Sequence, residues 1–177
     1  MKLFNIVFAI ASLIYVSFSE VSCQTAESKL VLKAVFKGTY NLTKGDSTIY
    51  FLVEVKLINN TDSICDFMAY NCAAGASILF NSDQVKICPN QCSMNYPTHI
   101  IINPNQEFII PIVLQSKRDN SSLNGSLKIG YVLVPPSLFK ATNFNELLFN
   151  MKKNNENVLW SDAIFLSNTG GDPYDIR

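Results

Sequence analysis

An alternation of side chains over residues 48–58 limits the fold of this chain more than any other feature. Apolar side chains occupy every second position there, at Ile49, Phe51, Val53, Val55 and Leu57. Successive side chains of a β-strand point to opposite faces of the sheet, so this spacing indicates a strand with one buried face. Further strand-like segments lie at residues 29–37, 99–102, 107–115, 127–133 and 158–166. The chain is therefore expected to consist mainly of strands.

Turn-forming residues separate these segments. Residues 103–105 (NPN) and the pair Asn124-Gly125 are typical of tight turns. Pro111 cannot donate a hydrogen bond to a neighbouring strand, so it predicts a sheet edge or a bulge within residues 107–115. About seven short strands with such turns predict an all-β fold, an immunoglobulin-like antiparallel β-sandwich.

One short helix is expected before the last strand. Asn143 can cap its start, and Glu146 follows as the third helical residue. The apolar residues of this segment are spaced as on one helix face: Phe144, Leu147, Leu148 and Met151. A stripe of this width indicates a helix that covers the open end of the sandwich, with partner binding as the alternative.

The first residues have the pattern of a signal peptide. Met1 and Lys2 precede an apolar run over residues 3–18, which small and polar residues follow. A membrane-spanning helix needs roughly 20 apolar residues, and no later segment approaches this length. The sequence thus predicts a secreted or periplasmic protein.

Cleavage of this leader would divide the chain into three parts. These are a signal peptide over residues 1–23, a β-sandwich domain over 24–168 and a polar C-terminal tail over 169–177. Cys23 lies where a bacterial lipoprotein carries its lipidated cysteine, so lipid anchoring at the outer envelope is the alternative. Glu20, three positions upstream, suits the lipoprotein signal badly, and ordinary secretion is preferred.

The remaining cysteines are Cys65, Cys72, Cys88 and Cys92. An even number of cysteines in an oxidising compartment predicts two disulfides, and their spacing leaves the connectivity open. A zinc site is the alternative, but the spacing lacks the paired C-x2-C of zinc ribbons. No metal or cofactor is therefore predicted.

Charge limits the class of partner. The chain has 14 basic and 14 acidic residues and a formal net charge of zero. A neutral chain has no field to hold polyphosphate or an anionic membrane surface, which argues against nucleic acid as a partner. An unknown protein or glycan of the cell envelope is the expected partner.

No catalytic constellation is evident. His99 is the only histidine, and its place at the start of an apolar strand indicates a structural role. No G-x-S-x-G motif surrounds a serine. The acidic residues are scattered over turns and strand faces, although two of them could form a glycosidase pair. The chain is expected not to be an enzyme, and a small secreted hydrolase is the alternative.

The segment from Cys65 to Cys92 is the expected place for recognition. Its run of small residues at 73–77 (AAGAS) packs little, and flanking disulfides would keep an exposed loop ordered. Met94 and Tyr96 are candidate partner-binding residues, because methionine and tyrosine are enriched at interfaces. The predicted function is a non-catalytic exported binding or envelope-associated module, of which a protease inhibitor is a special case. The plainer interpretation is a loop that needs cross-linking because it makes few apolar contacts.

Trp160, the only tryptophan, is expected to anchor the core. It lies in phase with Val158, Ile164 and Leu166 on an alternating segment. Asp162 shares that face, so a bulge or the end of burial is expected near it. The alternative is an exposed tryptophan that stacks on a sugar.

Short motifs carry a resemblance to known proteins. Residues 67–72 (FMAYNC) and 92–97 (CSMNYP) resemble segments of small uncharacterised exported proteins of Bacteroidetes-type bacteria. Strand ends and turns at residues 57–61, 103–106, 130–131 and 159–162 are similar to those of immunoglobulin-like folds. The resemblance covers about residues 28–168 and implies the pairs Cys72–Cys92 and Cys65–Cys88. The Cys–Trp–Cys spacing of antibody domains is absent.

Four N-x-S/T triplets begin at Asn41, Asn59, Asn120 and Asn124. In a eukaryotic secretory protein they would be glycan sites on exposed turns. In an asparagine-rich bacterial chain they arise by chance, and the bacterial resemblance therefore implies no glycan.

Overall fold

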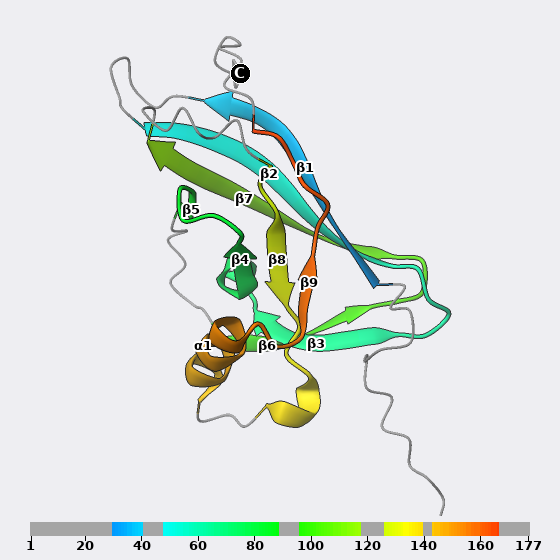
Figure 1. The fold of residues 1–177 in the computed structure, drawn as a ribbon. Coiled ribbons are helices and arrows are strands. Elements are labelled where there is room, and N and C mark those ends of the chain that lie inside the picture. Colours follow the sequence, from blue (N-terminus) through cyan, green and yellow to red (C-terminus); the bar gives the residue numbers. More distant parts are fainter. Residues whose placement is uncertain (1–29, 41–47, 89–95, 118–125, 140–142, 167–177) are drawn as a thin grey trace, which may run out of the picture.

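Antiparallel strands make up most of the computed structural model, which describes residues 30–40, 48–88, 96–117, 126–139 and 143–166 (Figure 1). In chain order the elements are β1 (Leu30–Tyr40), β2 (Thr48–Asn59), β3 (Cys65–Tyr70), the 3-10 helix η1 (Ala74–Ser77), β4 (Ile78–Phe80), β5 (Lys86–Ile87), β6 (Pro97–Ile102), β7 (Glu107–Lys117), β8 (Ile129–Val132), the 3-10 helix η3 (Pro136–Leu138), α1 (Phe144–Asn154) and β9 (Val158–Trp160). The predicted all-β class, with one α-helix before the last strand, is confirmed.

The largest sheet has the strand order β1-β2-β7-β5, with all its pairs antiparallel. The alternation read from the sequence decides which face of β2 is buried, since Phe51, Val53, Val55 and Leu57 have no exposed surface. Whereas β1 and β7 pair with β2 along nearly its whole length, β5 pairs only with the end of β7. Most of one edge of β7 therefore extends beyond β5.

A second layer closes the core. It consists of the pair β3-β6 and the three-stranded sheet β4-β8-β9. Figure 1 shows the long strands β1, β2 and β7 lying across β8 and β9. Between the layers the Phe67 ring packs edge-on against Tyr131 and Phe108, with centroid distances of 5.9 and 6.3 Å. This packing is that of a sandwich, while the immunoglobulin-like order of connections stays a prediction.

The helix α1 covers the outer side of the second layer. Its buried residues Phe144, Leu148 and Met151 form a second apolar cluster with residues of β3 and β8. The Tyr70 hydroxyl also donates a hydrogen bond to Asn145 of the helix, and burial raises the pKa of this tyrosine. The buried apolar stripe is as predicted, but the helix covers a side of the second layer, whereas the prediction placed it over the open end of the sandwich.

The predicted core position of Trp160 is wrong. Its side chain is 38% exposed, on the outer side of β9. Leu159 and Ser161 take the inward positions, because the Ser161 hydroxyl accepts a hydrogen bond from the Ile129 amide (3.1 Å) and donates one to the Asp162 carbonyl (2.7 Å). These hydrogen bonds satisfy the buried hydroxyl of Ser161 and so allow this residue to point inward. Because neighbouring residues of a strand point to opposite faces, Trp160 then points outward.

The triplet at Asn59 is part of the fold. The Asn59 side chain is fully buried, and its amide donates hydrogen bonds to the carbonyls of Ser63 (2.8 Å) and Ile102 (2.9 Å). Its carbonyl oxygen accepts hydrogen bonds from the amide and hydroxyl of Thr61. A glycan on this nitrogen would break the corner that joins β2 to the β6–β7 turn. The triplets that begin at residues 41, 120 and 124 lie outside the described residues.

Several predictions on the chain ends fall outside the described residues. These are the signal peptide over residues 1–23, lipidation of Cys23 and the tail over 169–177, and all stay predictions. In the part of the chain that the structure describes, no helix has the length and apolar character needed to cross a membrane.

Candidate functional site

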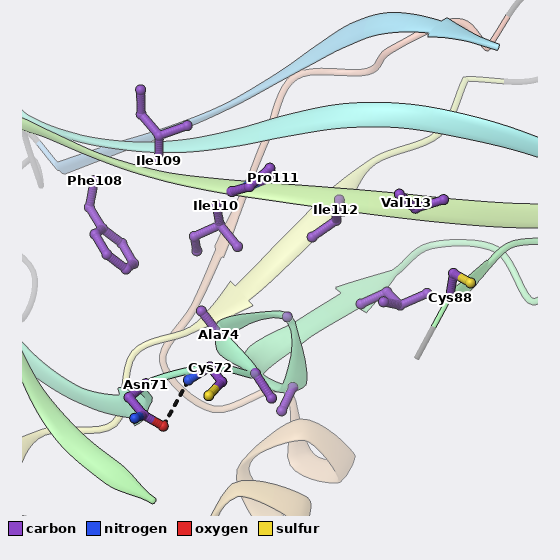
Figure 2. A pocket seen from close by; sticks show the side chains of 14 residues that line it. Asn71, Cys72, Ala74, Cys88, Phe108, Ile109, Ile110, Pro111, Ile112 and Val113 are labelled. Carbon is purple, nitrogen blue, oxygen red and sulfur yellow. Dashed lines mark hydrogen bonds between the residues drawn. The ribbon is translucent and has the colours of Figure 1, made fainter. Parts of the chain in front are cut away.

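A pocket of about 810 Å³ separates the segment around η1 from the edge of β7 (Figure 2). Residues 71–76 form one wall, residues 108–113 form the other, and Ile87 and Cys88 close one end. None of the described lining residues carries a charged side chain. The pocket lies partly within the segment from Cys65 to Cys92, where the sequence predicts recognition.

Small side chains create the space. The wall at residues 73–76 consists of three alanines and Gly75, so few atoms extend from it toward β7. Ala74 on η1 points toward Ile110 and Ile112 of β7 (Figure 2). A Cβ atom on Gly75 would lie 3.5 Å from Ile87 Cδ1 and 3.7 Å from Ile112 Cγ2, so the pocket narrows at that point.

The rest of the protein holds this wall at both ends. At one end Lys152 of α1 donates a hydrogen bond from Nζ to the Ala76 carbonyl over 2.9 Å, and burial lowers the pKa of this lysine. At the other end Asn71 and Tyr96 bond to each other. The Asn71 amide donates to the Tyr96 carbonyl (3.1 Å), and the Tyr96 amide donates to Asn71 Oδ1 (3.2 Å). The wall is therefore fixed relative to β3, β6 and α1.

The edge of β7 forms the opposite wall. The Cys88 amide donates to the Val113 carbonyl over 2.7 Å, so the main-chain groups of Val113 point away from β2 and toward β5. Main-chain groups in a strand alternate in direction, and those of Pro111 and Ile109 therefore face the same side. This orientation explains why a proline is tolerated here, because its missing N–H costs no bond to β2. Among the described residues no strand pairs with this side of β7 at Pro111, whereas the prediction of a sheet edge or a bulge there stays a prediction.

The predicted Cys65–Cys88 disulfide is absent. Cys65 is enclosed by the main core at the start of β3, which pairs with β6, whereas Cys88 follows β5 at the pocket. Cys65 pairs with Ile102 and Cys88 bonds to Val113, so the two cysteines have different neighbours in the fold. Cys72, which also lines the pocket, is disulfide-bonded. Cys92 lies outside the described residues, so its pairing with Cys72 stays a prediction.

Of the two candidate partner-binding residues, Met94 and Tyr96, the structure describes only Tyr96. The Tyr96 side chain is 57% exposed, and the main chain of Tyr96 bonds to Asn71 at one end of the pocket. Met94 lies outside the described residues. Tyr96 therefore adjoins the pocket through its main chain and is not one of the described lining residues.

Two buried hydroxyl groups lie near the end of η1, one on Ser77 and the other on Tyr131. The Ser77 and Tyr131 hydroxyls are enclosed by protein, and neither makes a hydrogen bond of good geometry within the described residues. Burial strongly raises the pKa of Tyr131, and the neighbouring Ser77 hydroxyl acts in the opposite direction with a smaller effect. The phenol is thus neutral at ordinary pH and sealed from solvent.

Some titratable side chains outside the pocket form pairs on the surface. His99 on β6 lies 3.4 Å from Asp66 on β3, and both side chains are about half exposed. Glu54 pairs with Lys37 at 3.0 Å. Among the described residues no group of three histidines, cysteines or acids could hold a metal ion. His99 therefore makes a cross-strand contact on the surface.

Sequence reasoning missed the second wall of the pocket. Residues 108–113 are an ordinary strand by their pattern, and only the fold brings them opposite residues 71–76. The one local signal was Pro111, which indicated an open edge. A local sequence pattern does not reveal which loop faces that edge, since the two segments are far apart in the chain.

Comparisons with known proteins find no family model that matches this chain and no characterised protein with detectable similarity to it. The resemblance to exported bacterial proteins therefore stays a prediction.

Proposed function

We propose that this chain is a non-catalytic exported binding module whose ligand site is the pocket between η1 and β7. One observation carries the proposal: an uncharged pocket of about 810 Å³ lies between two walls that the scaffold holds in place. Ligand pockets are typically about 300–1,000 Å³, mostly apolar, and contain few polar groups. Here Asn71 and the main chain of β7 supply polar groups, so the ligand is expected to be uncharged and partly apolar.

The placement of the acidic residues supports a binding role over hydrolysis. A glycosidase needs two carboxylates about 5–10 Å apart across a cleft. The described lining of the pocket contains no carboxylate and no histidine. Asp66, Glu54 and Glu107 each lie beside a basic side chain on the sheet surfaces. A hydrolase is therefore the weaker proposal.

Titration with Nile red, a neutral apolar dye, tests the pocket as a binding site. Ala74→Leu places a larger side chain in the pocket, and we expect the dye affinity to fall roughly tenfold or more. Ala163→Leu makes the same change at an exposed position and should leave the affinity unchanged. Thermal unfolding of both variants checks that they fold. Equal dye binding by all three proteins would contradict the proposal.

A further inference from the structure

We propose that the outer face of the large sheet binds a partner protein, whose acidic side chains meet the lysines of this face and whose apolar side chains cover its aliphatic residues. The outer face is the side of β1, β2, β7 and β5 whose residues alternate with the buried ones, as Leu52 does between Phe51 and Val53. This surface is separate from the pocket, which lies between the same sheet and η1.

The chain has no net charge, but its charges are unevenly distributed. The strand register and the ion pairs place five lysines and two glutamates on the outer face, an excess of three positive charges: Lys33, Lys37, Lys56, Lys86, Lys117, Glu54 and Glu107. The other charged residues that the structure describes are six acids and three lysines. The outer face is therefore the basic side of the described part of the chain.

The stretches that adjoin these strands in the sequence leave this balance unchanged. Residues 1–29, 41–47 and 118–125 each contain equal numbers of basic and acidic residues, and residues 89–95 contain none. Asp83, in the turn before β5, makes no ion pair with a described lysine of the face. The excess of positive charge thus belongs to the strands themselves.

Both carboxylates of the face are already paired within it. Glu54 lies 3.0 Å from Lys37, and Glu107 lies 3.3 Å from Lys56. Three exposed lysines of the face have no ion pair among the described residues: Lys33, Lys86 and Lys117. Their ammonium groups are available to donate hydrogen bonds to the carboxylates of a partner.

One of these lysines lies in an unfavourable position. Lys33 is directly opposite Lys56 in the β1–β2 ladder, and like charges in such a pair destabilise it. Glu107 pairs with Lys56 from β7, which is on the other side of β2 from Lys33. A carboxylate from a partner beside Lys33 would relieve this repulsion, which favours an acidic partner.

Aliphatic side chains of the same face are also exposed. Val35 on β1, Leu52 on β2 and Ile109 on β7 are 38%, 37% and 42% exposed. Ile109 points to the opposite side of β7 from Ile110, which faces Ala74 across the pocket (Figure 2). A ligand that binds by charge alone would leave these three side chains in water, whereas a protein can cover them with its own apolar atoms.

The size of the face fits a reversible protein complex. The strands β1, β2 and β7 have 11, 12 and 11 residues. At about 3.3 Å per residue and about 4.8 Å between strands, they form a face of roughly 500 Å². Two such surfaces bury roughly 1,000 Å² in total, which is the range of weak and transient complexes.

The residue types favour a protein over an anionic membrane. Proteins that bind at a membrane surface present aromatic side chains to the interface. The exposed aromatic residues that the structure describes lie on other elements: Tyr96, Phe149, Trp160 and Phe165. The outer face therefore has lysines and aliphatic residues but lacks the side chains typical of membrane anchoring.

A fluorescein-labelled decapeptide of alternating glutamate and leucine serves as the probe, with fluorescence anisotropy as the measurement. Lys33→Gln/Lys86→Gln should weaken its binding roughly three- to tenfold, and added salt should weaken it further. Lys128→Gln/Lys153→Gln removes the same charge elsewhere and should have little effect. The first variant should bind Nile red as the wild type does, since neither lysine lines the pocket.

A second pair of variants tests the aliphatic part of the face. Leu52→Gln should weaken binding of the alternating peptide roughly threefold or more, because it removes apolar contact. Ile64→Gln makes a comparable change at an exposed residue of the turn before β3 and should not. Thermal unfolding checks that all the variants fold.

Three results would each overturn the inference. If the Lys33→Gln/Lys86→Gln variant binds the alternating peptide as tightly as the wild type, the face is not available to a partner. If a decapeptide of glutamate alone binds equally well, the face holds anions of any kind. If vesicles of phosphatidylglycerol and phosphatidylcholine bind the wild type but not the double lysine variant, the face serves a membrane.

Discussion

The ring of Trp160 lies directly over the backbone of Gly130, its partner in the β8–β9 ladder. A Cβ atom on Gly130 would lie 3.0 Å from Cζ3 of that ring and 2.9 Å from Val158 Cγ1. The approach to Val158 is shorter than real Cβ contacts, and the approach to the ring is tighter than most of them, so Val158 and Trp160 together leave room only for glycine. The ring covers the backbone of Gly130 in a three-stranded sheet, and the other face of the ring is open to solvent.

Gly130→Ala is therefore expected to destabilise the domain by about 1–3 kcal/mol, as overpacked sites do. Gly75→Ala is the matched control, because its new Cβ would make ordinary contacts of 3.5 Å or longer. That variant should be neutral or up to about 1 kcal/mol more stable, since alanine restricts the unfolded chain. Urea unfolding measures both. Equal stabilities for the two variants would refute the packing of Trp160 on Gly130.

Asn59→Ala is expected to destabilise the domain by about 1–3 kcal/mol. It removes all four side-chain hydrogen bonds of the β2 corner and leaves the buried Ile102 carbonyl without this donor. The neighbouring Asn60 is exposed, so Asn60→Ala should change the free energy of unfolding little. A comparison of the urea midpoints of the two variants tests this corner. Equal losses of stability would show that the side-chain hydrogen bonds of Asn59 are unimportant.

The buried phenol of Tyr131 predicts a loss of stability at high pH. Burial raises its pKa in the folded state, so above the ordinary tyrosine pKa of about 10 only the unfolded chain releases this proton. The folded state then binds more protons than the unfolded state, and the free energy of unfolding falls as pH rises.

Tyr131→Phe should weaken this alkaline decline. At neutral pH the variant should be as stable as the wild type or slightly more stable, because the lost hydroxyl makes no hydrogen bond of good geometry. Tyr96→Phe makes the same change at an exposed position and is the matched control. Urea unfolding from neutral pH to above about pH 10 gives the free energy of unfolding of each protein as a function of pH. If Tyr131→Phe lost as much stability at high pH as the wild type, the buried phenol would not be the cause.

Lys152→Met tests the support of the pocket wall. The methionine retains an apolar side chain but loses the bond to the Ala76 carbonyl, which should cost about 1–2 kcal/mol of stability. Nile red affinity should also fall several-fold, because residues 73–76 lose one of their supports. Lys153 is exposed, and Lys153→Met should change neither quantity. A loss of stability with unchanged dye binding would show that Lys152 supports only the helix.

Local patterns predicted the parts of the fold that depend on local burial. The alternation of residues 48–58 gave the correct face of β2, and the spacing from Phe144 to Met151 gave the correct helix. Trp160 was assigned to the wrong face because β9 is only three residues long, and because the hydrogen bonds of Ser161 set its phase. The Cys65–Cys88 pair failed for a related reason, since only long-range strand pairing decides which sheet each cysteine joins. Only one wall of the pocket could be predicted from the sequence. The run of small residues at 73–77 is a local signal, whereas the position of β7 opposite that run depends on the fold.

NMR mapping of the amide groups tests the pocket most directly. Bound Nile red should shift the amide signals of Gly75, Cys88 and Ile109, which lie on the walls and at one end of the pocket. The amide of Trp160 on β9 should stay in place, because it does not line the pocket. Shifts confined to Trp160 and its neighbours, with Gly75 and Ile109 unmoved, would contradict the claim that the space between η1 and β7 is the ligand site.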